Sequence, residues 1–165
     1  KIGNPKEQAV QGMKADIDDG RLVLDPAQPG NVCDLWIGSN WVRLAHARAA
    51  VPANPVNTWA KHPDGSDGRG IQYPFLQPGP GEYLAEWDAT RLQPWKQVLH
   101  ALLRHHARDA ASAIGHISCE HIVAVDYGAG HRYSTFDNNV ACARWLRSAW
   151  TQALAASAQD TAGSH

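Results

Sequence analysis

The sequence predicts an α/β fold, in which helices alternate with parallel strands. Residues 91–109 carry an amphipathic helical pattern, with apolar side chains recurring on one face. Residues 115–126 follow as a mostly apolar run that contains Glu120, as expected for a buried strand. A glycine-containing loop at residues 127–133 then leads into a second helical pattern. This order is typical of α/β folds, whose sites lie at the carboxyl ends of strands and on the loops that follow them.

Two further strand candidates precede the amphipathic helix. A helix over residues 5–19 comes first, because its apolar residues recur at helical spacing. The next apolar run reaches Asp25 directly before a proline, which cannot continue a central strand. Residues 41–48 form the other candidate and carry His46 near their end. Each candidate strand therefore ends on a side chain that can bind a metal ion.

Residues 49–90 show neither a helical nor a strand pattern, although they keep many aromatic side chains. Prolines and glycines interrupt the segment throughout. A long loop inside a compact domain is usually functional, and a disordered linker seldom retains aromatic residues. We therefore expect an ordered excursion across one face, as a substrate lid or an oligomer contact. Lys61 and His62 in this loop are candidates for substrate contacts, although a loop lysine usually serves solubility alone.

The remaining segments are predicted to be short or helical. Residues 31–39 favour a weak helix or a turn. Asp137 is placed to cap a long final helix, and the small polar tail at residues 157–165 is expected to fray. All of residues 1–165 fit within a single α/β domain or a partial barrel.

Composition restricts the classes of partner. The 15 basic and 16 acidic residues nearly cancel, and no basic stripe is visible, which argues against binding to nucleic acid. The sequence contains neither an apolar run of membrane-spanning length nor a secretory signal, so we expect no membrane partner. The three cysteines lack zinc-ligand spacing and are expected to be buried thiols in the cytoplasm. The chain opens at Lys1 rather than at methionine, which is consistent with a fragment or a processed chain.

Asp25, His46 and Glu120 form the candidate metal site. In a parallel sheet joined by helices, all three would lie at the same end of the sheet. Their oxygen and nitrogen donors suit a divalent ion such as Mn²⁺, Mg²⁺, Co²⁺ or Zn²⁺. The alternative is that Asp25 caps a turn, His46 is a satisfied core histidine and Glu120 pairs with an arginine. Spacing alone favours this alternative.

The loop after the apolar strand is a candidate for binding substrate. His131 and Arg132 lie among glycines, and such loops cradle anions in many α/β proteins. The alternative is a flexible turn that leads into the final helix. The sequence leaves both interpretations open.

Short segments of this chain resemble those of a known family. They are Leu24-Asp25-Pro26-Ala27, Val42-Arg43-Leu44-Ala45-His46-Ala47-Arg48 and Ile117-Ser118-Cys119-Glu120. In this order they resemble the later strands of the xylose-isomerase-like TIM barrels, the sugar isomerases and epimerases of carbohydrate metabolism. Residues 67–75 and 138–146 also resemble uncharacterised members.

The resemblance implies an activity and a ligand set. Asp25, His46 and Glu120 would bind one divalent metal ion, together with another glutamate from an earlier strand. The reaction would be metal-dependent isomerisation or epimerisation of a sugar or related polyol. Asp25 and Glu120 would be ligands first, and would also carry the proton. The metal would bind adjacent hydroxyl and carbonyl oxygens of the substrate.

The chain departs from this family in three ways. Gln28 stands where the family often has a histidine, and Ala49 stands where it often has an acid. The earlier glutamate ligand has no counterpart, and 165 residues are fewer than the ~250 typical of a complete barrel. The rest of a barrel would then lie on another chain or segment, or the fold is a smaller open sheet.

A non-catalytic subunit that binds a partner through residues 49–90 is the alternative function. Cleavage of abasic DNA, known from the same barrels, is disfavoured by the near-neutral charge.

Overall fold

The structure is a computed structural model that describes residues 5–109 and 115–162. Helices and strands are mixed, and two of the strands pair in parallel, as expected for the α/β class, whereas the partial barrel stays a prediction. The elements are α1 (Pro5–Asp18), α2 (Val32–Gly38), β1 (Leu44–Ala47), β2 (Asn57–Lys61), β3 (Asp67–Gly68), the 3₁₀ helix η1 (Ala89–Leu92), α3 (Gln93–Arg108), β4 (His116–Cys119) and α4 (Thr135–Ala162).

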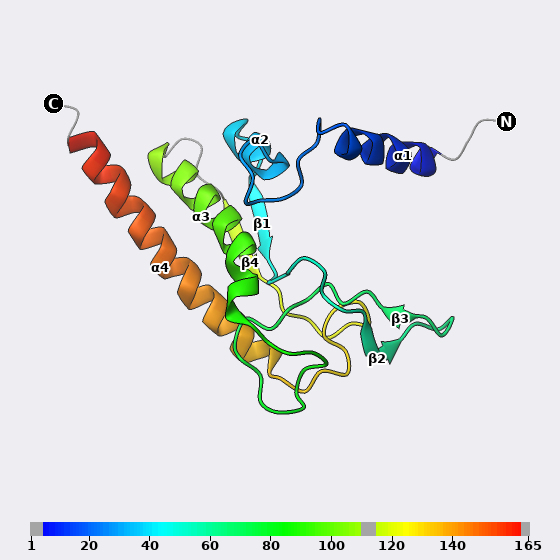
Figure 1. Cartoon of the computed structure of the whole chain (residues 1–165). Helices are drawn as coiled ribbons and strands as arrows, with labels where there is room; N and C mark the ends of the chain where they lie inside the picture. Colours follow the sequence, from blue (N-terminus) through cyan, green and yellow to red (C-terminus); the bar gives the residue numbers. More distant parts are fainter. Residues whose placement is uncertain (1–4, 110–114, 163–165) are drawn as a thin grey trace.

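A two-stranded parallel sheet lies at the centre of the fold. β1 pairs with β4 in a register that places Leu44 opposite His116 and Ala47 opposite Cys119. A parallel pair needs a long crossover connection, and here the chain between the two strands includes α3. Figure 1 shows α3 and α4 lying side by side next to the sheet, with long loops gathered beyond the carboxyl ends of the strands. The sheet thus presents one end to the loops.

The main core lies between α3, α4 and the sheet. α3 contributes Leu99, Leu102 and Leu103, which share one face of the helix because they are three or four residues apart. α4 faces them with small and apolar side chains. The buried members of this core are Ile37, Ala47, Leu99, Leu102, Leu103, Cys142, Leu146, Ala149 and Ala153. The helical pattern in residues 91–109 therefore corresponds to the face that covers the sheet.

A second core fixes the long excursion of residues 49–90. Within it, β2 and β3 form a small antiparallel hairpin, and Tyr73 and Tyr83 are buried edge to face with a centroid distance of 5.6 Å. The buried members of this core are Ala49, Tyr73, Tyr83, Leu92 and Tyr133. Aromatic burial of this kind explains how the excursion is ordered with little regular structure.

The expected strand that ends at Asp25 does not form. Asp25 lies in a turn instead, where its Oδ1 accepts a hydrogen bond from the Ala27 amide at 2.9 Å and its carbonyl accepts one from the Gln28 amide at 3.1 Å. Pro26 has no amide hydrogen to donate to a strand ladder, which favours the turn. Within the described residues the parallel sheet therefore has two strands, where the sequence predicted three.

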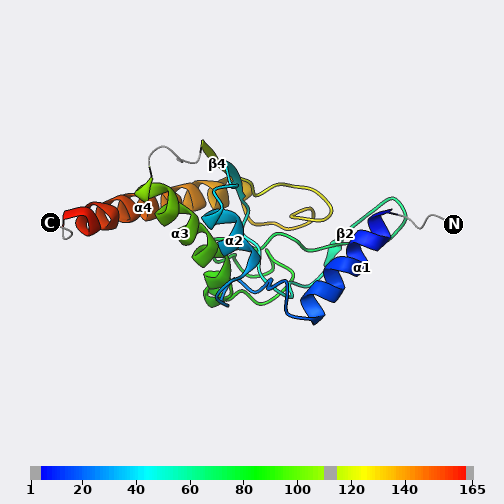
Figure 2. The same ribbon diagram turned by 90° about the horizontal axis from the view of Figure 1, so that it is seen from above.

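The helix expected over residues 5–19 is confirmed as α1, whereas the carboxyl-terminal end differs from the expectations. α4 begins at Thr135, and Ser134 Oγ accepts from the Asp137 amide at 3.1 Å, so Ser134 rather than Asp137 caps the helix. α4 continues to Ala162 through most of the expected tail, and residues 163–165 lie outside the described residues, as does Lys1. α1 stands apart from the helices that cover the sheet (Figures 1 and 2).

In residues 5–109 and 115–162, no helix has the length and apolar character needed to span a bilayer.

Candidate functional site

The parallel sheet brings two of the predicted site residues together. His46 is the third residue of β1, and Glu120 directly follows the last residue of β4. His46 Nδ1 lies 2.7 Å from Glu120 Oε1, and Ser118 Oγ donates to the same oxygen at 3.3 Å. The His46 side chain is 52% exposed and that of Glu120 is 27% exposed. The pair is therefore open to solvent and to small molecules.

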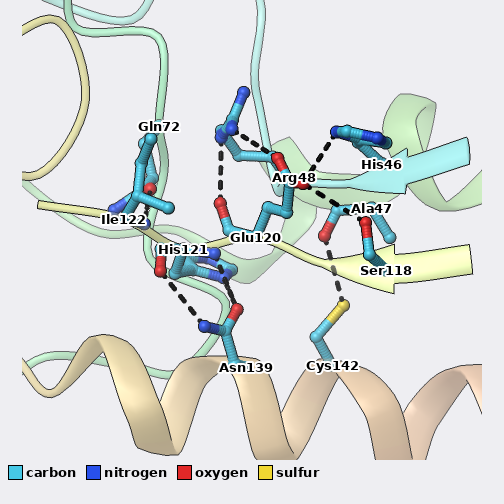
Figure 3. Close-up of polar contacts among 10 residues, drawn as sticks. All are labelled: His46, Ala47, Arg48, Gln72, Ser118, Glu120, His121, Ile122, Asn139 and Cys142. Atoms are coloured by element: carbon cyan, nitrogen blue, oxygen red, sulfur yellow. Dashed lines mark hydrogen bonds and ion pairs between the residues drawn. The ribbon is translucent and has the colours of Figure 1, made fainter. Parts of the chain in front are cut away.

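Arg48 binds Glu120 from the end of β1. Its Nη2 donates to Glu120 Oε2 at 2.7 Å, and its Nε donates to the Glu120 carbonyl oxygen at 2.9 Å (Figure 3). The guanidinium also stacks over the Tyr127 ring at 4.3 Å from its centroid. Both oxygens of Glu120 are thus engaged, one by a cation and the other by an imidazole and a hydroxyl. These contacts fix the orientation of the Glu120 side chain.

Asn139 of α4 binds the backbone of His121, the residue that follows Glu120. Asn139 Oδ1 accepts from the His121 amide at 2.6 Å, and Asn139 Nδ2 donates to the His121 carbonyl at 3.1 Å. The buried His121 ring lies 3.2 Å from the Tyr73 carbonyl oxygen through Nε2. Burial lowers the pKa of His121, and the nearby Arg48 lowers it further. The hydrogen bonds that the ring makes to the Tyr73 carbonyl oxygen and to Asn139 Oδ1 act in the opposite direction. Neutral His121 therefore serves as a fixed support beneath Glu120.

Gln72 holds the segment on the side of the excursion. Its buried amide accepts from the Ile122 amide at 2.8 Å through Oε1 and donates to the Tyr133 hydroxyl at 2.9 Å through Nε2. Gly128 packs so closely that an added Cβ would lie 2.7 Å from Gln72 Nε2. Residues 120–122 are therefore fixed from β1, from α4 and from the excursion, as Figure 3 shows.

Asp25 lies away from the His46–Glu120 pair. Besides the turn bonds described above, its Oδ2 accepts from Gln28 Nε2 at 3.4 Å. No group of three or more His, Cys, Asp or Glu side chains in the described part of the chain is close enough to hold a metal ion. Of the predicted ligands, the structure thus brings His46 and Glu120 together and leaves Asp25 in its own turn.

Lys61 and His62 lie on the β2–β3 hairpin, where both pair with carboxylates. Lys61 forms an ion pair with Asp67, and His62 Nε2 lies 2.9 Å from Asp126 Oδ1. Arg69 Nη2 lies 2.8 Å from Asp126 Oδ2, and the Arg69 amide donates to Asp126 Oδ1 at 3.0 Å. The Arg69 side chain and amide, followed by His62, hold the pKa of Asp126 far below its usual range. His62, Asp67, Arg69 and Asp126 line an open cleft of about 590 Å³.

His131 and Arg132 occupy different environments. The His131 ring packs among Tyr83, Tyr133 and Trp59, with centroid distances of 5.1, 5.4 and 5.6 Å. Its ring nitrogens are buried, no described residue hydrogen-bonds to them, and burial lowers the pKa of the imidazole. Arg132 is exposed and lines a second cleft, of about 470 Å³, with Trp59, Gly81 and Gly130. Of the two, Arg132 faces the cleft available to a ligand.

The sequence offered an arginine as the alternative partner of Glu120, and the structure identifies that arginine as Arg48. Arg48 follows His46 by two positions and lies directly after β1, so strand alternation favours the same face for both side chains. Gln72, Tyr127 and Asn139 come from three separate segments. No periodicity links those segments to β4, and the tertiary structure alone reveals their contacts.

Comparisons with known proteins identify no relative: no family model matches the sequence, and no curated protein or solved structure is similar to it. The family resemblance of the strand segments thus stays a prediction.

Proposed function

We propose that this chain contributes to a divalent-metal-dependent isomerase or epimerase that acts on a sugar or a related polyhydroxy compound. One observation carries the proposal: His46 Nδ1 lies 2.7 Å from Glu120 Oε1 at the carboxyl ends of two adjacent parallel strands. α/β enzymes commonly place their reactive side chains at this end of the sheet. The resemblance of the strand segments to sugar isomerases supports the same assignment.

The donor set fits a divalent ion in part. An imidazole nitrogen and a carboxylate oxygen suit Mn²⁺, Co²⁺ or Zn²⁺, and Mg²⁺ through the oxygen. The remaining ligands would have to come from water, from substrate oxygens or from further residues. Asp25 would have to leave its hydrogen-bonded turn to take part. When bound, such an ion would polarise a substrate carbonyl and so acidify the adjacent C–H group.

Residues of the chain itself would orient the Glu120 carboxylate and transfer the substrate proton. Arg48 fixes Oε2 of Glu120, which leaves Oε1 directed toward His46 and Ser118. Because half of the His46 side chain is exposed, it can exchange a proton with solvent or substrate. In the proposed reaction Glu120 would take up the proton of the C–H group next to the substrate carbonyl, while the C–H electron pair passes to the carbonyl oxygen. Glu120 would then return the proton to carbon, and His46 would stabilise the carboxylate before and after the transfer.

Substrate contacts come from the loops at the same end of the fold. The cleft beside Trp59 and Arg132 offers an indole ring and a guanidinium, which suit the apolar face and the hydroxyls of a sugar. His62 lines the cleft at Asp126, and Lys61 pairs with Asp67 of the same cleft, so both would contact a longer substrate. We propose a cytoplasmic setting because the three cysteines are free thiols. Nucleic acid is not a proposed partner, because the net charge is −1.

Metal binding and C–H exchange test this function together. We expect Mn²⁺ titration, followed by electron paramagnetic resonance, to show one bound ion in the wild type and weaker binding in His46→Ala and Glu120→Gln. His105→Ala, a change on α3, serves as the matched control. Aldoses and ketoses in D₂O should gain deuterium next to the carbonyl. A wild-type protein that binds no Mn²⁺, Co²⁺ or Zn²⁺ and exchanges no C–H hydrogen would contradict the proposal.

A subunit role is the second candidate, and the free edges of the sheet favour it. Within the described residues β1 and β4 pair with each other alone, so the outer edge of each strand is open. Large apolar side chains of α1, of α2 and of the segment that leads into and begins β1 are also exposed: Val10, Met13, Leu35, Trp36, Trp41 and Leu44. Sedimentation velocity of the wild type and of Trp41→Glu tests this role. Concentration-dependent association that the substitution removes would support a subunit, whereas a monomer at all concentrations would oppose it.

A further inference from the structure

We propose that Cys119 and Cys142 form a redox-active pair, which closes to a disulfide on oxidation and then links α4 to the end of β4. Cys119 is the last residue of β4, and Cys142 lies in the second turn of α4. All three cysteines of the chain are free in the structure. The proposed cross-link does not depend on the function proposed above.

The sheet register brings the two thiols together. Cys119 is the ladder partner of Ala47. The Cys142 thiol donates to the Ala47 carbonyl oxygen with an Sγ–O distance of 3.7 Å, so Cys142 approaches the same rung of the sheet (Figure 3). Burial raises the pKa of the Cys142 thiol, and the Cys119 thiol, which hydrogen-bonds with it, raises the pKa further. Both cysteines therefore lie beside Ala47, one on the neighbouring strand and the other on α4, which places the two thiols near each other.

The two cysteines differ in exposure, which assigns their roles. Cys142 is completely buried in the main core, whereas Cys119 is partly exposed. Cys119 also lines an open pocket of about 440 Å³, together with Ile117 and Trp150. A small oxidant such as a peroxide therefore reaches Cys119 first. Cys142, shielded from solvent, then serves as the resolving thiol.

The chemistry balances with a hydroperoxide as the oxidant. The Cys119 sulfur attacks one peroxide oxygen, the O–O bond breaks, and the product is a Cys119 sulfenic acid with one water from hydrogen peroxide. The Cys142 sulfur then attacks the Cys119 sulfur, the S–O bond breaks, and a second water leaves. Both thiol hydrogens end in water, the two sulfurs are oxidised, and the peroxide is reduced. A dithiol reductant reverses the reaction.

The position of the pair gives the cross-link a consequence for the strand end. Glu120 directly follows Cys119, and Asn139, which binds His121, lies three residues before Cys142 on the same face of α4. Closure therefore connects the helix and the strand at the segment that holds the Glu120 carboxylate. A disulfide here joins residues that are 23 positions apart, so it also removes conformational entropy from the unfolded chain.

Intact-mass analysis of the full chain tests the proposal. The reduced protein is treated with a small excess of hydrogen peroxide, alkylated, and digested for peptide mapping. We expect the loss of two alkylatable thiols, a Cys119–Cys142 peptide and full reversal by dithiothreitol. Cys33→Ser, the matched control on α2, should behave as the wild type does, whereas Cys119→Ser and Cys142→Ser should lose the cross-link.

Two results would overturn the proposal. One is that peroxide adds oxygen to the wild-type cysteines without joining Cys119 to Cys142. The other is that the main disulfide involves Cys33. Circular dichroism of the serine variants shows whether they fold, and the wild-type and Cys33→Ser results decide the question even if one of those variants does not.

Discussion

Arg48 binds both the main chain and the side chain of Glu120. Its Nε donates to the Glu120 carbonyl oxygen at 2.9 Å, and its Nη2 donates to the carboxylate at 2.7 Å. The planar guanidinium can make both bonds at once because its donors have a fixed geometry. The backbone position and the carboxylate orientation of Glu120 are therefore determined by one residue on the neighbouring strand.

Replacing Arg48 should destabilise the protein. Arg48→Met removes the charge and both bonds and leaves a partly buried carboxylate, so we expect the free energy of unfolding to fall by about 1.5–3 kcal/mol. Arg48→Lys keeps the charge without the paired geometry and should fall between this variant and the wild type. Urea unfolding monitored by tryptophan fluorescence measures the change.

An exposed arginine provides the control for Arg48. Arg21 forms ion pairs with Asp16 and Asp19, and its side chain is 63% exposed. Because water screens exposed pairs, Arg21→Met should change the free energy of unfolding by less than about 1 kcal/mol. Equal losses in the two methionine variants would show that the Arg48–Glu120 contacts contribute nothing specific.

Asp126 should make the stability of the protein sensitive to acid. Arg69 first, and then His62, hold the pKa of Asp126 below its unfolded value, so the ionised form stabilises the folded state. This stabilisation is fully present above the unfolded pKa of about 3.9 and is lost as the pH falls toward the folded pKa. Asp126→Asn should therefore flatten the fall of stability below about pH 4. Urea unfolding across this acid range checks it, with Asp18→Asn on α1 as the control.

His131 should also make the folded protein less stable as the pH falls, but in a higher pH range than Asp126. Burial lowers its pKa in the folded state, so the unfolded chain takes up the proton first as the pH falls below about 6.5. The wild type should thus lose stability between about pH 7.5 and pH 5.5. His131→Phe keeps a ring among the aromatic neighbours and removes the titrating group, so it should lose less. A steeper loss in the phenylalanine variant, measured by urea unfolding at each pH, would contradict this expectation.

Gly68 should tolerate no side chain. A Cβ at this position would overlap the Val125 carbonyl oxygen, which belongs to the loop that follows β4. The two nearest atoms, the carbonyl oxygen and carbonyl carbon of Val125, belong to the backbone and cannot rotate away. Gly68→Ala should therefore lower the free energy of unfolding by more than about 2 kcal/mol. Gly12 in α1 has no atom within 4 Å of such a Cβ, so Gly12→Ala is the matched control and should not destabilise the protein. Thermal unfolding of the two alanine variants compares them directly.

The sequence predicted those parts of the fold that depend on neighbours along the chain. The apolar face of residues 91–109 matches α3, because a buried helix face follows directly from three- and four-residue spacing. The strand over residues 41–48 contains β1, and the run over residues 115–126 contains β4. β4 is shorter than predicted, because it ends at Cys119 and Glu120 lies just after it rather than inside it. The prediction of a strand that ends at Asp25 was wrong. Local hydrogen bonds to Asp25 favour a turn there, and the pattern of apolar residues does not reveal them.

The candidate site divides in the same way. The sequence by itself determined that His46 and Glu120 lie at strand ends, since a strand end is set by the local pattern of apolar residues. The tertiary structure alone decided that β1 pairs with β4, that Arg48 binds Glu120, and that Asp25 stays apart. It also decided that Gln72 and Asn139 support the strand end from opposite sides. These contacts join residues from 18 to 72 positions apart, and their geometry depends on how the helices and the excursion pack around the sheet.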